Sequence, residues 1–275
     1  MNNSPVTLPV RLSSTPYEKV WGTPLTEPWY QNLERRDIGE IWFSASDQVP
    51  ILVKFLFTSD RLSVQVHPED EYARVHENSR GKTEMWHILR AEPDAQVALG
   101  LRETIPPERL RDASLSGEIE NLLNWIPARP GDTFFVPAGT IHAIGGGLVL
   151  CEVQQKSDVT YRLYDYGRPR ELHLDASMAV SSLTPYQSSQ TPTALSDGHT
   201  LLAECQYFRT ELLEVQGEVQ CPAPLRNTLY IVLKGAGLIA GQIFEIGEAW
   251  EAAAGSAPFT LSSAAGATLL ITSAP

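Results

Sequence analysis

Short runs in which apolar and polar residues alternate follow one another along most of the chain, with glycine- or proline-containing turns between them. This period of two is typical of β-strands, because successive side chains on a strand point to opposite faces. The run at 51–57 is almost continuously apolar, which predicts a strand buried on both faces. We therefore predict an all-β fold, with a glycine-rich hairpin at 139–147. The main expected strands lie at 6–12, 38–44, 51–57, 62–67, 97–101, 134–136, 148–153, 160–166, 208–215, 228–233, 237–240 and 268–271.

One region departs from this pattern and predicts a small helical insertion at about 103–126. Its apolar residues recur at helical spacing, and they are Leu110, Leu115, Ile119, Leu122 and Leu123. Two prolines open the region and Gly117 weakens its middle, so the pattern fits two short helices as well as one. The acidic segment at 68–74 predicts a further helical turn or two.

The last third of the chain differs in composition and predicts a second domain. Residues 181–200 are rich in Ser, Thr, Pro and Gln, which is typical of a linker, so we assign 1–180 and 201–275 to separate domains. Residues 246–255 repeat the turn, short strand and glycine turn of 130–139, but Pro258 stands where the first copy has His142. The simplest architecture is two short β-barrels, of which the first carries a candidate metal site described in the next paragraph.

Four residues of the first domain have side chains that can bind a metal. Gln65 and His67 lie two apart, so on a strand they share a face. Glu84 begins the next apolar run, and His142 follows a glycine turn far downstream. Two nitrogens and two oxygens form a ligand set that suits zinc or another divalent ion.

Composition and charge limit the partners and the compartment. The formal net charge of −12 excludes a general nucleic-acid-binding surface, although it allows a local basic pocket for one phosphate. The three cysteines have no metal-type spacing, so we expect reduced thiols in a cytoplasmic protein. The first residues do not resemble a signal peptide, and no apolar run is long enough to span a bilayer, so no membrane partner is expected.

Four motifs, in this order, resemble type I phosphomannose isomerases (mannose-6-phosphate isomerases) of the short bacterial branch. They are LSVQVHPEDEYA at 62–73, GKTEMW at 81–86, VPAGTIHAIGGG at 136–147 and EVQQKSDVTYRLYDYGR at 152–168. Each motif is weak alone and specific in series. The last third of the chain resembles the family only in its cupin-like turn pattern.

This resemblance implies a cupin barrel that holds one zinc ion per chain, with the ligands Gln65, His67, Glu84 and His142. It also implies that Arg162 lies over the active site as a catalytic residue, with Lys54 and Lys82 as further catalytic candidates. The expected substrate-binding residues are Ser63, Lys82, Glu152 and Asp158.

The reaction implied by the resemblance interconverts mannose 6-phosphate and fructose 6-phosphate by proton transfer through a cis-enediol. A divalent metal would polarise the carbonyl and hydroxyl oxygens, and Arg162 and Lys82 would bind phosphate or developing oxyanion charge. Lys54 interrupts an apolar run, and the pattern equally fits a lysine whose ammonium reaches solvent. The base stays open among Lys54, Glu152, Asp158 and a hydroxide on the metal.

Two other classes of protein share parts of this pattern. One is a cupin enzyme for another phosphosugar, or an iron oxygenase, although oxygenase sites use three histidines or two histidines and a carboxylate. The other is a non-enzymatic cupin that binds a sugar or a metal. The complete ligand set and Arg162 favour an enzyme. Both a monomer and a dimer are compatible with the sequence.

Overall fold

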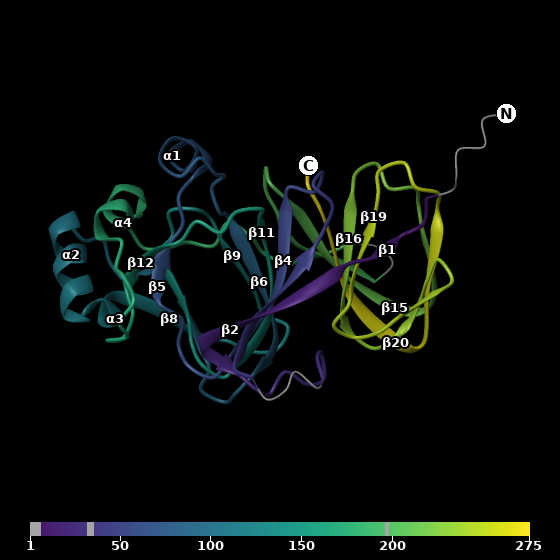
Figure 1. Ribbon diagram of the computed structural model, residues 1–275, viewed down its shortest axis with the longest axis horizontal. Helices are drawn as coiled ribbons and strands as arrows, with labels where there is room; N and C mark the ends of the chain where they lie inside the picture. Colours follow the sequence, from purple (N-terminus) through teal and green to yellow (C-terminus); the bar gives the residue numbers. More distant parts are fainter. Residues whose placement is uncertain (1–6, 32–35, 196–197) are drawn as a thin grey trace.

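The computed structural model describes residues 7–31, 36–195 and 198–275, and it arranges them in three antiparallel sheets (Figure 1). The six-stranded sheet has the order β2 (Ser13–Thr23), β3 (Ile38–Ser44), β4 (Ile51–Thr58), β11 (Leu148–Gln155), β6 (Glu84–Ala91) and β9 (Thr133–Val136). The five-stranded sheet has the order β12 (Tyr161–Tyr164), β5 (Val64–Val66), β10 (His142–Ile144), β7 (Gln96–Leu101) and β8 (Leu123–Pro127).

The nine-stranded sheet contains almost the whole C-terminal part of the chain. Its main path is β1 (Val10–Arg11), β19 (Ala249–Ala252), β16 (Thr228–Lys234), β20 (Phe259–Ser273), β15 (Arg209–Cys221), β14 (His199–Glu204) and β13 (Thr193–Ala194). The hairpin of β17 (Gly237–Ile239) and β18 (Gln242–Phe244) joins it through β20. Strand β1, from the N-terminal segment, pairs with β19 of the C-terminal part. It therefore belongs to the sheet of the second predicted domain, and the division into domains at 181–200 stays a prediction.

The six-stranded sheet is the central layer and is covered on both faces (Figure 1). On one face, Trp86 and Leu150 pack with Val97 and Leu99 of the five-stranded sheet. On the other face, the core includes Phe55 together with residues of the nine-stranded sheet. This double burial explains why the strand at 51–57 reads as almost continuously apolar.

The helices lie outside the five-stranded sheet or at its edge (Figure 1). They are α1 (Asp70–His76), α2 (Pro107–Ser116), α3 (Ile119–Leu122) and α4 (Leu174–Val180). Gly117 ends α2 with a φ of 83°, a left-handed conformation that favours glycine, so the insertion forms two helices. Within the described residues, no helix is long and apolar enough to cross a membrane.

Four details of the structure differ from the sequence predictions. Leu115 is 64% exposed, so it does not belong to the apolar face of the insertion. The stretch 139–147 is not a hairpin, because β10 runs between β5 and β7 of the five-stranded sheet. Helix α4 was not predicted, since seven residues are too few for a helical period to show. Of the first expected strand at 6–12, residue 6 lies outside the described residues, and within 7–12 only Val10–Arg11 form a strand.

The internal repeat has the same backbone conformation in both copies. Gly131 and Gly247 precede β9 and β19 with φ angles of 93° and 86°. Gly139 and Gly255 follow these strands with φ angles of 82° and 76°. The two copies therefore use glycine at the same two turns, because an L side chain is strained at such angles.

The burial of His87 predicts an acid-sensitive contribution to stability. Its side chain lies in β6 against Thr133 Oγ1 at 2.9 Å, and burial lowers its pKa to about 4. The unfolded chain therefore binds a proton between about pH 6.5 and 4 that the folded chain does not, and stability falls as pH falls through this window. We expect His87→Gln to reduce this loss by about 3 kcal/mol, measured by urea unfolding of metal-free protein from pH 7 to pH 4. His76→Gln, on the exposed side of α1, serves as the control and should keep the parent slope.

Candidate metal centre and active site

Three neighbouring strands of the central sheet place polar side chains on the same face of that sheet. Lys54 on β4 is opposite Glu152 on β11, and Glu152 is opposite Trp86 on β6. Directly opposed residues project to the same face of a sheet. Glu84 lies two positions before Trp86 on β6, so it projects to that face as well.

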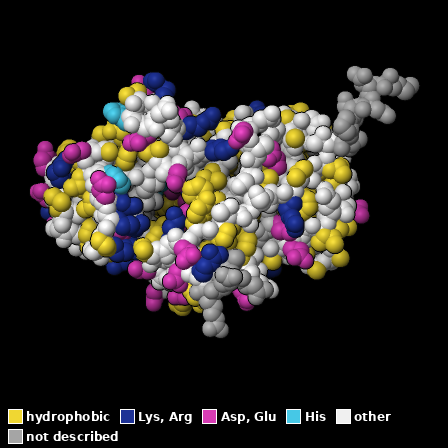
Figure 2. Space-filling model, viewed as in Figure 1, with side chains coloured by type: hydrophobic (Ala, Val, Ile, Leu, Met, Phe, Trp, Pro, Cys, Tyr) yellow, Lys and Arg dark blue, Asp and Glu magenta, His cyan; other side chains and the backbone are white. Residues whose placement is uncertain are grey.

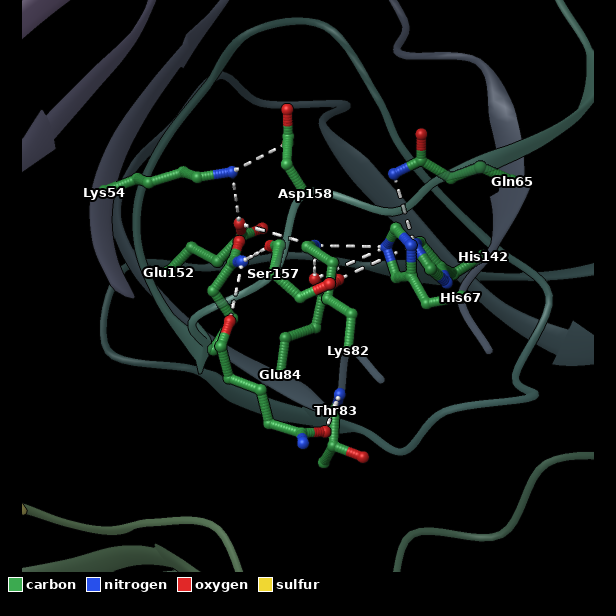
Figure 3. A network of polar contacts seen from close by, with 12 residues as sticks. Lys54, Gln65, His67, Lys82, Thr83, Glu84, His142, Glu152, Ser157 and Asp158 are labelled. Carbon is green, nitrogen blue, oxygen red and sulfur yellow. Dashed lines mark hydrogen bonds and ion pairs between the residues drawn. The ribbon is translucent and has the colours of Figure 1, made fainter. Parts of the chain in front are cut away.

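The five-stranded sheet contributes the other half of the site. Gln65 on β5 is opposite His142 on β10, and their side-chain nitrogens are 3.3 Å apart. His67 is the first residue after β5 and lies two positions after Gln65. The two side chains therefore share a face, as the sequence predicts. Figure 3 shows the two histidines and Gln65 reaching toward the lysines and glutamates from the opposite side. The site therefore lies between the two facing sheets.

Three buried side chains form a group that can hold a metal ion: His67, Glu84 and His142. The Nδ1 atoms of both histidines lie 2.8 Å from backbone oxygens, which are those of Val159 and Thr140. A carbonyl oxygen only accepts, so each Nδ1 carries the proton and each Nε2 keeps its lone pair. Burial lowers the pKa of both imidazoles, to about 4 for His142, which favours the neutral form that a metal needs.

The spacing of these ligand atoms fits a small divalent ion. Each Nε2 lies 3.5 Å from a different carboxylate oxygen of Glu84, and all three residues offer atoms within 4.8 Å of one another. Ligand atoms about 2.1 Å from a tetrahedral zinc ion are about 3.4 Å apart, which matches the two separations of 3.5 Å. The amide of Gln65 lies on the open side, where a half-turn about its last torsion exchanges Nε2 for Oε1 and provides a fourth donor.

Two ammonium groups neutralise the two buried carboxylates. Lys82 Nζ donates to Glu84, and it lies 3.1 Å from His67 Nε2 and 3.6 Å from Glu152. Lys54 Nζ lies 3.6 Å from Glu152 and 3.9 Å from Asp158. Lys54 is 3% exposed, so it is a pocket residue and its ammonium does not reach solvent.

The pKa values of Glu152, Lys82 and Glu84 are shifted in different ways by burial and by the neighbouring charges. Burial alone would raise the pKa of Glu152, but Lys82 and Lys54 hold it below its ordinary value, so Glu152 remains a carboxylate. Burial alone would lower the pKa of Lys82, but Glu152 and Glu84 raise it, so Lys82 remains a cation. Burial, and next the Glu152 charge, raise the pKa of Glu84. A metal ion at Glu84 would oppose that shift.

A cavity of about 280 Å³ adjoins these side chains, and its lining includes Gln65, Lys82 and Glu152. Figure 2 shows Lys and Arg side chains gathered around a hollow in the half of the molecule that carries the two smaller sheets. Its lining includes seven of the residues proposed from the sequence, which are Lys54, Ser63, Gln65, Lys82, Glu152, Asp158 and Arg162. The remaining three, His67, Glu84 and His142, are buried and contact the lining residues Lys82 and Gln65. The structure thus brings all ten together.

Arg162 is a half-buried candidate at the wall of the cavity. It lies on β12 at the cavity wall, and its Nη1 donates to the backbone oxygen of Glu171 at 2.7 Å. Its buried Nε has no hydrogen-bond partner among the described residues. Burial lowers its pKa, with a further contribution from Arg170. A guanidinium group remains charged at neutral pH, so Arg162 can bind an anion at the cavity wall.

Several lining residues escaped the sequence analysis. Lys19, Glu40 and Arg170 also line the cavity. The Trp42 ring lies 4.2 Å from Lys54 Nζ, and its indole donates to Glu40 at 2.6 Å. Glu40 could have been found from the sequence, because it is an acidic residue within an apolar run. Trp42 could not, because it meets Lys54 only through the pairing of β3 with β4.

Comparisons with known proteins were made by sequence and by structure, and no family model matches the chain. By sequence, it is 38% identical over 232 residues to the mannose-6-phosphate isomerase ManA of Bacillus subtilis, covering 80% of this chain and 72% of that protein. It is also 38% identical over 227 residues to a mannose-6-phosphate isomerase of Streptococcus mutans, covering 79% and 70%.

The structural matches agree with the sequence matches. The mannose 6-phosphate isomerase structure from Bacillus subtilis superimposes with a TM-score of 0.85 at 26% identity, over 97% of this chain and 99% of that one. A zinc-bound mannose 6-phosphate isomerase superimposes with a TM-score of 0.78 at 16% identity, over 98% of this chain and 100% of that one. The second match supports the fold alone.

Proposed function

The chain belongs to the bacterial mannose-6-phosphate isomerase family, and from that premise we propose that it interconverts mannose 6-phosphate and fructose 6-phosphate. The observation that carries the proposal is the buried group of His67, Glu84 and His142 behind a cavity lined by lysine and arginine. An anionic sugar phosphate matches the charge of that lining.

The proposed cofactor is one zinc ion per chain, held by His67, Glu84 and His142, with the Gln65 amide oxygen as the fourth ligand. Two imidazole nitrogens with fixed tautomers and two oxygens fit this ion. When bound, zinc supplies a Lewis acid that polarises the carbonyl and hydroxyl oxygens of the open-chain sugar, without redox chemistry. Gln65 is neutral, so this set adds only one negative charge to the ion.

The proposed mechanism assigns the proton transfer to Glu152. Its carboxylate stays ionised beside Lys54 and Lys82, and it can take the proton from C2 of mannose 6-phosphate and deliver it to C1 of the cis-enediol, while the hydroxyl proton moves from O2 to O1. Lys54 keeps Glu152 charged and in place. Lys82 opposes the negative charge that develops on the sugar oxygens.

The remaining proposed roles concern binding of the substrate. Arg162 binds the phosphate or the outer sugar hydroxyls from the cavity wall, while Ser63 and Asp158 provide polar contacts to the sugar. We also propose that the two facing sheets form a cupin-type barrel, that a second such unit without metal ligands follows the linker, and that the enzyme works in the cytoplasm. A non-enzymatic sugar-binding cupin is the alternative to this function.

Metal removal tests the function and the cofactor together. We expect isomerisation of mannose 6-phosphate to disappear after treatment with a chelator and to return on addition of one equivalent of zinc. Conversion would be followed through fructose 6-phosphate in a coupled assay. Activity that persists in protein shown to be metal-free would reject the zinc site. A folded, zinc-loaded protein without turnover would favour the binding protein.

A further inference from the structure

Trp86 has polar contacts that set it apart from an ordinary core residue. Its side chain is 0% exposed and packs in the core between the two smaller sheets. Its indole Nε1 lies 3.1 Å from Glu84 Oε1 and 3.1 Å from Glu152 Oε2. One N–H group therefore bridges a proposed metal ligand and the proposed base. Trp29 and Trp125, by comparison, donate to the backbone oxygens of Leu233 and Glu120.

The contacts of Trp86 and Lys82 close a ring around the two carboxylates. Glu84 turns Oε1 to the indole and Oε2 to the Lys82 ammonium. Glu152 turns Oε2 to the indole and Oε1 to Lys82 and Lys54. Each carboxylate is thus held at both oxygens, which fixes its rotation as well as its position.

The two donors in this ring differ in stiffness. The Lys82 ammonium ends a flexible stem with four carbons, whereas the Trp86 N–H is part of a rigid ring. That ring is buried and packs edge-on against His142, with 5.5 Å between ring centroids and an angle of 69°. Trp86 is therefore the fixed donor of the pair. The oxygen that it holds, Glu84 Oε1, is also the oxygen that lies 3.5 Å from His142 Nε2.

We infer that Trp86 is a positioning residue, whose indole N–H orients Glu84 for metal binding and ties it to Glu152. This inference rests on the proposed function, because it assumes that Glu84 is a metal ligand. Replacing a residue that donates a hydrogen bond to a metal ligand typically lowers metal affinity by about 10- to 100-fold. The indole can do this without adding charge to the site.

Two substitutions separate the hydrogen bond from packing. Trp86→Phe and Trp86→Leu both remove the donor, but they leave cavities of different size. We expect both to weaken zinc binding by a similar factor of about 10 to 100, measured by competition with a chromophoric chelator. The thermal midpoint of the metal-free protein should fall further for Trp86→Leu, since cavity size governs stability.

Trp125→Phe is the matched control, because it removes an indole N–H bond in the same part of the chain but outside the site. It should bind zinc as the parent does. Unchanged zinc affinity in Trp86→Phe would overturn the inference. So would a loss of affinity that is much larger in Trp86→Leu than in Trp86→Phe, since that result would indicate packing alone. A parent protein that binds no zinc would reject the proposed cofactor site, and the two failures are therefore distinguishable.

Discussion

Replacing His142 by asparagine is expected to remove the metal from the site and to lower kcat/KM by about a thousandfold. The shorter side chain of His142→Asn cannot place a donor where Nε2 now lies, 3.5 Å from Glu84. Lewis-acid stabilisation of the reacting oxygens is worth several kcal/mol, and about 4 kcal/mol corresponds to a factor of about a thousand. Zinc content after dialysis and the rate of isomerisation would be measured on the same samples.

His87→Gln provides the control for this substitution. His87 is also buried, on β6 of the central sheet, but its imidazole contacts Thr133 and is not part of the group formed by His67, Glu84 and His142. It should retain zinc and the parent activity at neutral pH. A His142→Asn protein that keeps its zinc, or that keeps more than about a tenth of the activity, would contradict the assignment of His142 as a ligand.

The residues of the proposed metal centre could be predicted from sequence because their signals are local. A spacing of two along a strand is enough to put Gln65 and His67 on one face, and the structure agrees. Glu84 follows the turn at Gly81, where a side chain would collide with the backbone of residues 68–70. His142 follows the turn at Gly139, which has a positive φ angle. The buried strand β4 was also predicted within one residue of its end.

The residues that organise these ligands could not be predicted in this way. Trp86 lies in an apolar run, and it reads as a core residue because that is where its ring packs. Its second acceptor, Glu152, is 66 residues away and becomes a neighbour only through the pairing of β6 with β11. Lys54 was ambiguous for the same reason, since its partners belong to other strands. Strand pairing over long separations is not encoded in any single run.

Replacing Lys54 by methionine is the second substitution with a large expected effect. Lys54→Met removes the ammonium that lies 3.6 Å from Glu152, while the apolar part of the side chain keeps its packing. We expect kcat to fall by about 100- to 1,000-fold with zinc affinity retained, because a charge that supports the reaction is lost. Lys156→Met, at a lysine whose side chain is 41% exposed, is the matched control and should behave as the parent does.

The pH profile and an arginine variant distinguish a supporting cation from a base. Lys54 and Lys82 together hold the pKa of Glu152 below its ordinary value, so removal of Lys54 raises that pKa. Because the base must be ionised, the acidic limb of kcat/KM should move to higher pH in Lys54→Met. Lys54→Arg keeps the cation and should recover at least about tenfold of the lost rate. If arginine at this position is as inactive as methionine and the acidic limb does not move, then Lys54 itself is the base and Glu152 is its partner.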